Sequence, residues 1–211
     1  MMVDERFINR IMARAAWRMR RVYPDDVISV TEASHPCLRW AYLGRRRQPK
    51  PTGYEALLHL GNAIHEMIQI ELTREGYETE VRLALNLDGI RIVGRADAVR
   101  YEVTPLAEEV AVDVLEFKTV EELPKKPHEH HVMQLQAYLN ILESDVGHII
   151  YIDRRVGRIK VFKVRRNPKA LNKIKERAKQ LHEYLMKDEL PPPKQGPWCN
   201  YCPYKLYCRK Y

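Results

Sequence analysis

The sequence predicts an α/β fold in which a mixed central sheet is flanked by helices. Strand-like runs follow one another in the order β-β-β-α-β-β, and segments with apolar residues at helical spacing precede and follow them. The chain has 211 residues and is 45% hydrophobic, which is enough for one domain with a buried core and a small appendage. No internal repeat or low-complexity linker divides it.

Three helices are expected before the first of these strands. The run over 4–22 has apolar residues at helical spacing, and Pro24 breaks it. Ser29 supplies the hydroxyl of a helix cap, so a short helix is expected to start there. A segment that contains Pro and Gly then leads to a long helix over about 54–75, which Gly76 closes.

The remaining elements alternate apolar runs with turn signals. Asp88-Gly89, between the first two of these runs, is typical of a hairpin. We expect strands near 78–86, 90–100, 110–118, 147–153 and 158–164, and helices over 128–143 and 168–187. The Pro191–Pro193 run then ends the last helix and begins a cysteine-containing tail.

Charge and hydropathy limit the classes of partner. No run of 18 or more apolar residues is present, and the N-terminus lacks the apolar core of a signal peptide, so we expect a cytoplasmic chain without a membrane span. The net charge of +8 favours a polyanionic partner, because neutralising phosphates releases counterions. A solvated, solubilising surface explains the same surplus equally well.

Two carboxylates stand inside strand-like runs. Asp97 lies within the run Val93–Ala98, and Glu116 follows Val112–Leu115. Burying an unpaired carboxylate costs several kcal/mol, so these positions together with Lys118 indicate a compensating cation, most simply a hard divalent metal. Taken singly, Glu116 and Lys118 are as well explained by an exposed ion pair on one strand face.

The chain contains four cysteines in an unusual arrangement. Cys199 and Cys202 form a C-x-x-C pair, Cys208 follows shortly, and Cys37 lies 162 positions before Cys199. Disulfides are rare in cytoplasmic chains, and zinc ribbons use two paired knuckles, whereas one cysteine here is single and remote. Cys202 is followed by a proline, as in ferredoxin-type iron–sulfur motifs, so both an iron–sulfur cluster and zinc remain open at this point.

The ordered set of motifs resembles the PD-(D/E)XK nuclease superfamily in its RecB-like branch. The pieces are His65 in Gly61–His65, Gly94-x-x-Asp97, Glu116-x-Lys118 and Gln134-x-x-x-Tyr138. With the four cysteines, the layout is similar to the iron–sulfur RecB-like nucleases, and the short length points to the CRISPR-associated exonuclease family Cas-four. The resemblance extends from about Ser29 to Tyr211.

The resemblance implies a fold and a set of ligands. The fold is a restriction-endonuclease-like core, a single RecB-like nuclease domain over 1–211. Its N-terminal helical part, 1–53, and its cysteine-rich part, 190–211, are expected to be tied together by a structural [4Fe–4S] cluster on Cys37, Cys199, Cys202 and Cys208. The implied ligands of Mn²⁺ or Mg²⁺ are His65, Asp97, Glu116 and the backbone carbonyl of Phe117.

It also implies catalytic roles. Lys118 is expected to share a strand face with Glu116 and to reach the attacking water or the scissile phosphate, while the Phe117 side chain points into the core. Gln134 and Tyr138, spaced i, i+4 on a helix, are expected to orient the substrate and Lys118. Asp97, Glu116, Lys118, Gln134 and Tyr138 are thus the expected catalytic residues.

The implied activity is that of an exonuclease on single-stranded DNA or DNA ends, which trims fragments before their integration into a CRISPR array. The implied partner is the CRISPR adaptation integrase complex, and an oligomer is possible. Three alternatives stay open: a non-catalytic DNA-binding or assembly module, a RecB-like nuclease of repair or recombination, and a redox or zinc module built on the cysteines. The histidines at 128, 130 and 131 are more simply a solvated loop than a second metal site.

Overall fold

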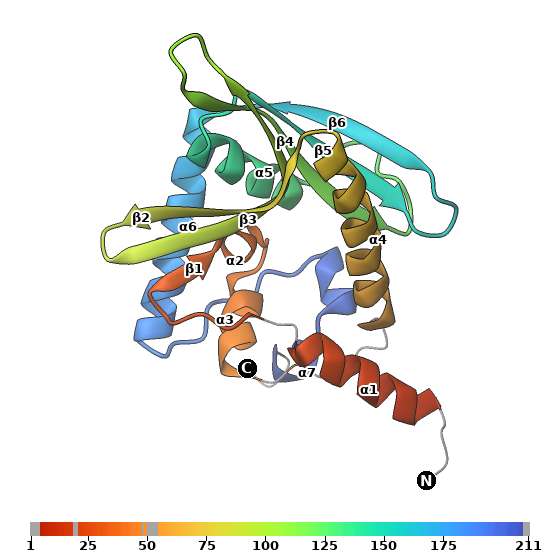
Figure 1. Cartoon of the computed structure of the whole chain (residues 1–211). Coiled ribbons are helices and arrows are strands. Elements are labelled where there is room, and N and C mark those ends of the chain that lie inside the picture. Colours follow the sequence, from red (N-terminus) through yellow and green to blue (C-terminus); the bar gives the residue numbers. More distant parts are fainter. Residues whose placement is uncertain (1–4, 19–20, 48, 50–54, 209–211) are drawn as a thin grey trace.

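A computed structural model describes residues 5–18, 21–47, 49 and 55–208, and its centre is one mixed sheet of six strands (Figure 1). The strands are β1 (Val27–Ser29), β2 (Glu78–Leu87), β3 (Ile90–Val103), β4 (Glu109–Val120), β5 (Val146–Asp153) and β6 (Ile159–Arg165). They are ordered β1-β3-β4-β5-β6, and β2 pairs with β3 beside this path. The β1–β3 and β4–β5 pairs are parallel and the others are antiparallel.

Helices cover both faces of the sheet. They are α1 (Glu5–Arg18), α2 (Val30–Ser34), α3 (Leu38–Arg46), α4 (Glu55–Arg74), α5 (Glu129–Ile141), α6 (Pro168–Met186), the 3-10 helix η1 (Pro197–Tyr201) and α7 (Lys205–Cys208). None of the helices among the described residues combines the length and the apolar character needed to cross a membrane.

The predicted mixed α/β fold is confirmed, and all five expected strands are present. Four elements were not predicted: β1, which has only three residues, α3, which begins directly after Cys37, and the two short helices of the tail, η1 and α7. The predicted helix over 4–22 is too long, because residues 21–24 are not helical. The proline at position 24 disfavours helical geometry in the residue before it. The last helix ends at Met186, five residues before the proline run that was expected to end it.

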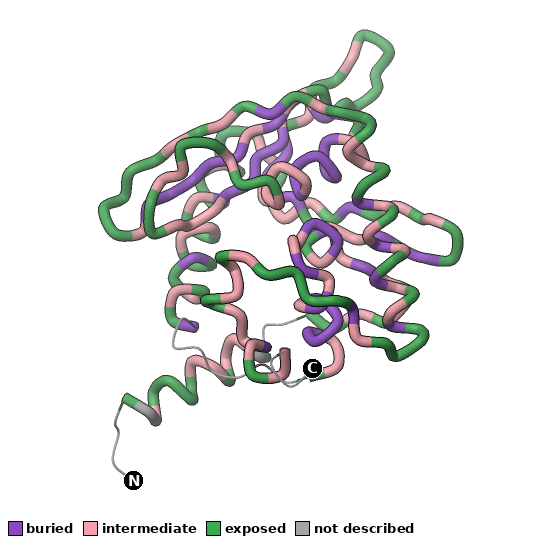
Figure 2. The backbone as a smooth tube through the Cα atoms, turned by 180° about the vertical axis from the view of Figure 1, so that it is seen from behind, coloured by how far each residue is buried: buried purple, intermediate pink, exposed green. Residues whose placement is uncertain are grey.

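The two faces of the sheet bury separate apolar clusters. The larger lies under α2, α5 and α6 and includes Ile92, Val114 and Leu135. The smaller lies under α4 and includes Leu115 and Phe117. Figure 2 shows the buried residues following the central strands through the middle of the molecule. Because β4 alternates between the two clusters, Glu116 and Val114 face the larger one.

The predicted cap at Ser29 is confirmed, and it fixes how β1 enters α2. The Ser29 hydroxyl accepts from the backbone N–H of Glu32, and the Glu32 carboxylate accepts from the backbone N–H of Ser29. Arg45 of α3 binds both oxygens of Glu32 and also donates to the carbonyl of Val27. Since Arg45 is nearly fully buried, this ion pair ties β1, α2 and α3 into one unit.

β3 has an opening along one edge. One edge of β3 pairs with β2. The opposite edge, which contains the opening, pairs with β1 through Arg91–Val93 and with β4 from Ala98 onwards. Among the described strands, neither β1 nor β4 pairs with residues 94–97. The sheet therefore diverges at Gly94–Asp97, and side chains from helices on both faces reach this gap.

Candidate active site

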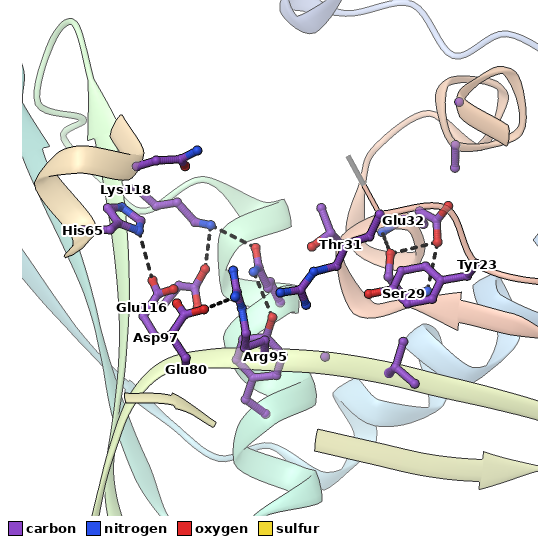
Figure 3. A pocket seen from close by; sticks show the side chains of 18 of the residues that line it. Tyr23, Ser29, Thr31, Glu32, His65, Glu80, Arg95, Asp97, Glu116 and Lys118 are labelled. Atoms are coloured by element: carbon purple, nitrogen blue, oxygen red, sulfur yellow. Dashed lines mark hydrogen bonds and ion pairs between the residues drawn. The ribbon is translucent and has the colours of Figure 1, made fainter. Parts of the chain in front are cut away.

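A cleft of about 870 Å³ lies at the gap in the sheet. His65 of α4, Asp97 of β3, Glu116 and Lys118 of β4, and Gln134 and Tyr138 of α5 all line it. The structure thus brings together six of the seven residues predicted for the nuclease site. The seventh, Phe117, lies between Glu116 and Lys118, with its side chain buried in the smaller core as expected. Figure 3 shows the cleft and the polar contacts within it.

Lys118 is the centre of the polar contacts. Its Nζ donates to Glu116 Oε1 at 2.6 Å and to Gln134 Oε1 at 3.0 Å (Figure 3). Although burial alone lowers the pKa of a lysine, the carboxylates of Glu116 and Asp97 raise that of Lys118. Lys118 therefore carries a positive charge at neutral pH and acts as a hydrogen-bond donor and electrostatic partner, with no tendency to act as a base.

Gln134 and Tyr138 fix the direction of these contacts. The Nε2 of Gln134 donates to the Tyr138 hydroxyl at 3.0 Å, which leaves its Oε1 turned toward Lys118. The Tyr138 hydroxyl oxygen also accepts a hydrogen bond from the backbone N–H of Arg95, a contact that lowers the pKa of the phenol against the larger effect of burial. One chain of hydrogen bonds therefore runs from the gap in β3 through α5 to Lys118, and it determines the orientation of the Gln134 amide.

Gly94 is required for this chain. A Cβ at Gly94 would lie 2.6 Å from Cε1 of Tyr138 and 3.1 Å from Cγ2 of Val30. The aromatic ring therefore packs directly on the backbone of β3, which only glycine permits at this distance. This close approach is the physical reason for the glycine in the Gly94-x-x-Asp97 motif.

His65 and Asp97 approach the site from the opposite face. His65 Nδ1 lies 3.8 Å from Asp97 Oδ2, and the same carboxylate oxygen accepts from the backbone N–H of Phe117 at 2.7 Å. The helix α4 packs closely here, since a Cβ at Gly61 would lie 2.8 Å from Oγ1 of Thr119. Burial lowers the pKa of His65, so its imidazole is neutral near pH 7, the form that binds a metal ion.

Glu116 is a buried carboxylate with only one of its two oxygens hydrogen-bonded within the part of the chain that the structure describes. Its side chain is 2% exposed, and Oε2 has no hydrogen-bond partner among the described residues. Burial, and then the nearby Asp97 carboxylate, raise the pKa of Glu116 to about 8. Two carboxylates and one orphaned oxygen fit a divalent cation, which removes both the repulsion and the missing contact.

The side chains do not by themselves form a closed metal cage. Within the described parts of the chain, no group of three or more His, Cys, Asp or Glu side chains is arranged to hold a metal ion. The fit of a cation therefore rests on Glu116 Oε2 and the adjoining Asp97 carboxylate. The roles of His65 and of the Phe117 carbonyl as further ligands stay predictions.

Three residues of the cleft were missed by sequence reasoning. Arg95 forms an ion pair with Glu80, and Gln69 donates to the other oxygen of Glu80 at 2.8 Å. Gln69 lies one helical turn after His65, so i, i+4 spacing was the signal that pointed to it. Glu80 had no such signal, because its place depends on how β2 pairs with β3.

The histidine cluster is ordered at the start of α5. His131 Nδ1 and the Tyr151 hydroxyl are hydrogen-bonded at 2.8 Å, and the backbone N–H of His128 donates to the same oxygen at 3.0 Å. Burial lowers the pKa of His130 to about 4 and that of His131 further. His130 and His131 are thus neutral, partly buried residues of the first turn of α5, whereas His128 is exposed, as expected for the solvated loop that the sequence indicated.

The four cysteines gather where the tail meets α3. All are free thiols, and burial together with the neighbouring thiols of Cys199, Cys37 and Cys208 raises the pKa of Cys202. Nη1 of the buried Arg39 lies 3.7 Å from the Cys208 sulfur, and its Nε donates to the carbonyl of Pro191 at 2.6 Å. Residues separated by most of the chain therefore meet here, although the described thiols do not form a closed metal site.

Comparison with known proteins identifies the superfamily and the fold. Residues 5–209 match the family model described as the PD-(D/E)XK nuclease superfamily. The crystal structure of SSO0001 aligns with a TM-score of 0.69 at 23% identity, covering 98% of this chain and 96% of that one. An alkaline exonuclease (LHK-Exo) from Laribacter hongkongensis aligns with a TM-score of 0.52 at 12% identity, covering 77% and 89%. At these identities the two structures show a shared fold. No curated protein matches the sequence.

Proposed function

The chain belongs to the PD-(D/E)XK nuclease superfamily, and from this premise we propose that it is a metal-dependent deoxyribonuclease acting on single-stranded DNA or DNA ends. The observation that carries the proposal is the buried Glu116 carboxylate. It is paired with Lys118 through one oxygen, has its other oxygen unsatisfied and lies beside Asp97. An ion pair that only stabilises the fold requires no second carboxylate, whereas a site that binds a metal ion for phosphodiester hydrolysis uses both Glu116 and Asp97 as ligands.

In this proposal, Asp97 and Glu116 hold Mg²⁺ or Mn²⁺, with His65 and the Phe117 carbonyl as further ligands. When bound there, the cation lowers the pKa of the attacking water and stabilises the charge that develops on the phosphate. Lys118 has two of its three N–H groups engaged by Glu116 and Gln134. Its third donor is available to a phosphate oxygen or the attacking water, and its positive charge stabilises the transition state.

The shape of the site supports a single strand as substrate. A second cleft of about 530 Å³ lies beyond the first and shares Asn62, His65 and Lys118 with it. The second cleft is lined by Arg154 and by Tyr201 of the tail. An extended polynucleotide that passes from one cleft to the other places one phosphate beside Lys118 and runs past the ring of Tyr201 and past Arg154, which is paired with Glu121.

We further propose, from the sequence resemblance, that the enzyme trims DNA fragments before their integration into a CRISPR array, with the adaptation integrase complex as partner. A nuclease of repair or recombination with the same site is the alternative, and the genes that neighbour its own distinguish the two. The four cysteines are proposed to hold a [4Fe–4S] cluster that ties residues 1–53 to residues 190–211, with zinc as the alternative.

The direct test is cleavage of a labelled single-stranded DNA by the full chain in Mn²⁺, in Mg²⁺ and in EDTA. We expect shortening of the strand with either metal and none in EDTA, because Glu116 and Asp97 need a cation to act. Metal-independent cleavage would contradict the proposal. Binding without any cleavage would favour the DNA-binding module.

A second prediction concerns Tyr138. In Tyr138→Phe the ring still packs on Gly94, but the Gln134 amide loses its acceptor and its orientation toward Lys118 is no longer fixed. We expect kcat to fall by about tenfold, as for the loss of one orienting hydrogen bond, with KM little changed. Single-turnover cleavage rates measure this effect. Tyr184→Phe, which changes a tyrosine of α6 outside both clefts, is the matched control.

A further inference from the structure

The backbone of β2 and β3 is distorted at one point beside the active site. The two strands pair in register on both sides, from Glu78↔Val99 to Leu87↔Ile90, but Glu80 and Asp97 are skipped. Glu80 has a φ of 57°, which a non-glycine residue adopts only at a cost. On β3, Ala96 and Val99 face the larger core while Ala98 faces the smaller one, so side-chain alternation slips at Asp97.

This distortion turns Glu80 into the cleft, where it holds Arg95. One oxygen of Glu80 pairs with Nη1 of Arg95, and the other accepts from Gln69, which is 8% exposed. Figure 3 shows the Arg95–Glu80 pair beside Asp97 and Glu116. Backbone strain at functional sites is retained where the local geometry serves the site, and here it places a guanidinium next to the proposed metal ligands.

The position of Arg95 suits a phosphate adjacent to the one that is cut. Arg95 lies two residues before Asp97 on β3, and residues so spaced are roughly 7 Å apart along a strand. This is comparable to the separation of neighbouring phosphates in a polynucleotide. A guanidinium presents a planar fork that binds two phosphate oxygens at once, and a carboxylate offers it the same two-oxygen geometry.

We propose that Arg95 binds the substrate phosphate next to the scissile one, and that Glu80 occupies its place in the absence of DNA. The inference rests on the proposed nuclease function and assigns a binding residue to that site. Glu80 keeps the guanidinium extended into the cleft, and the incoming phosphate displaces the Glu80 carboxylate from it. The hydrogen bond from Gln69 continues to hold the Glu80 carboxylate after the phosphate has displaced it from Arg95.

The test measures binding of a labelled oligothymidylate by fluorescence anisotropy, with the cleavage-impaired Glu116→Gln background, at several salt concentrations. We expect Arg95→Ala to raise Kd by about tenfold and to reduce the slope of log K against log salt by about 0.7, the value for one phosphate contact on a single strand. Arg95→Lys restores the slope and only part of the affinity. Arg91→Ala, an exposed arginine of the same strand outside the cleft, is the control for lost charge.

Glu80→Gln separates substrate binding from a structural ion pair. It removes the competing carboxylate, so we expect Kd to fall, whereas a structural pair predicts an unchanged or higher Kd together with a lower melting temperature. An effect of Arg95→Ala no larger than that of Arg91→Ala would overturn the inference, as would an absence of DNA binding. If Arg95 has the expected effect and the wild type does not cleave, the inference stands and the proposed nuclease activity fails.

Discussion

Glu116→Gln is expected to lower the rate of metal-dependent DNA cleavage by about 10³-fold, the size of effect typical for removal of a principal electrostatic group. The substitution keeps the shape of the side chain and a hydrogen-bond acceptor for Lys118. It removes the charge that binds the cation and leaves Asp97 as the single carboxylate beside it. Since the mutation also removes the repulsion between two buried carboxylates, the fold is expected to be at least as stable without metal.

Asp113→Asn is the matched control for this prediction. Asp113 lies on the same strand, three residues before Glu116, and binds the Tyr77 hydroxyl and His148 away from the cleft. Cleavage rates with saturating Mn²⁺ are measured for both variants, together with thermal melting curves with and without the metal. Equal rates for Glu116→Gln and wild type would remove Glu116 from the mechanism.

Much of this site could be predicted because its residues follow local periodicities. The i, i+2 spacing placed Glu116 and Lys118 on one face of β4, and the i, i+4 spacing placed Gln134 and Tyr138 on one face of α5. The order of strands and helices likewise followed from hydrophobic patterns of sufficient length. These features depend on neighbours in sequence, which a single sequence shows directly.

The parts that were missed depend on pairing between distant segments. β1 is three residues long, too short for a hydrophobic pattern, and it exists because Val27–Ser29 pairs with β3. Glu80 enters the cleft because β2 is distorted opposite Asp97, and no local spacing reports that distortion. The helix α3 carries none of the usual start signals, because the Cys37 side chain makes no cap hydrogen bond and the first turn has no acidic residue.

The second large effect is expected from loss of the proposed metal centre on the four cysteines. In Cys208→Ser, we expect the free energy of unfolding to fall by about 2–5 kcal/mol, as when a cross-link that closes a long loop is removed. For a chain of this length the melting temperature falls by roughly 5–15 °C. The buried Arg39 adds to this loss, because its Nη1 lies 3.7 Å from the Cys208 sulfur, which would be a thiolate in the proposed metal centre.

Metal analysis and hydrogen exchange together decide what the centre is. A [4Fe–4S] cluster gives about four irons and four sulfides in each anaerobically purified chain, and zinc gives one metal ion without colour. Loss of the proposed cluster is expected to increase exchange in α3 and in residues 197–208 together. The two segments are coupled because Arg39 of α3 donates to the carbonyl of Pro191 and Trp40 of α3 packs against the ring of Tyr204. Leu206→Ala changes an exposed residue of the same tail and is the control. If the cysteines tie the two ends of the chain together, Cys208→Ser cannot both retain the metal and melt at the same temperature as Leu206→Ala. That result would mean that side-chain packing alone holds the fold there.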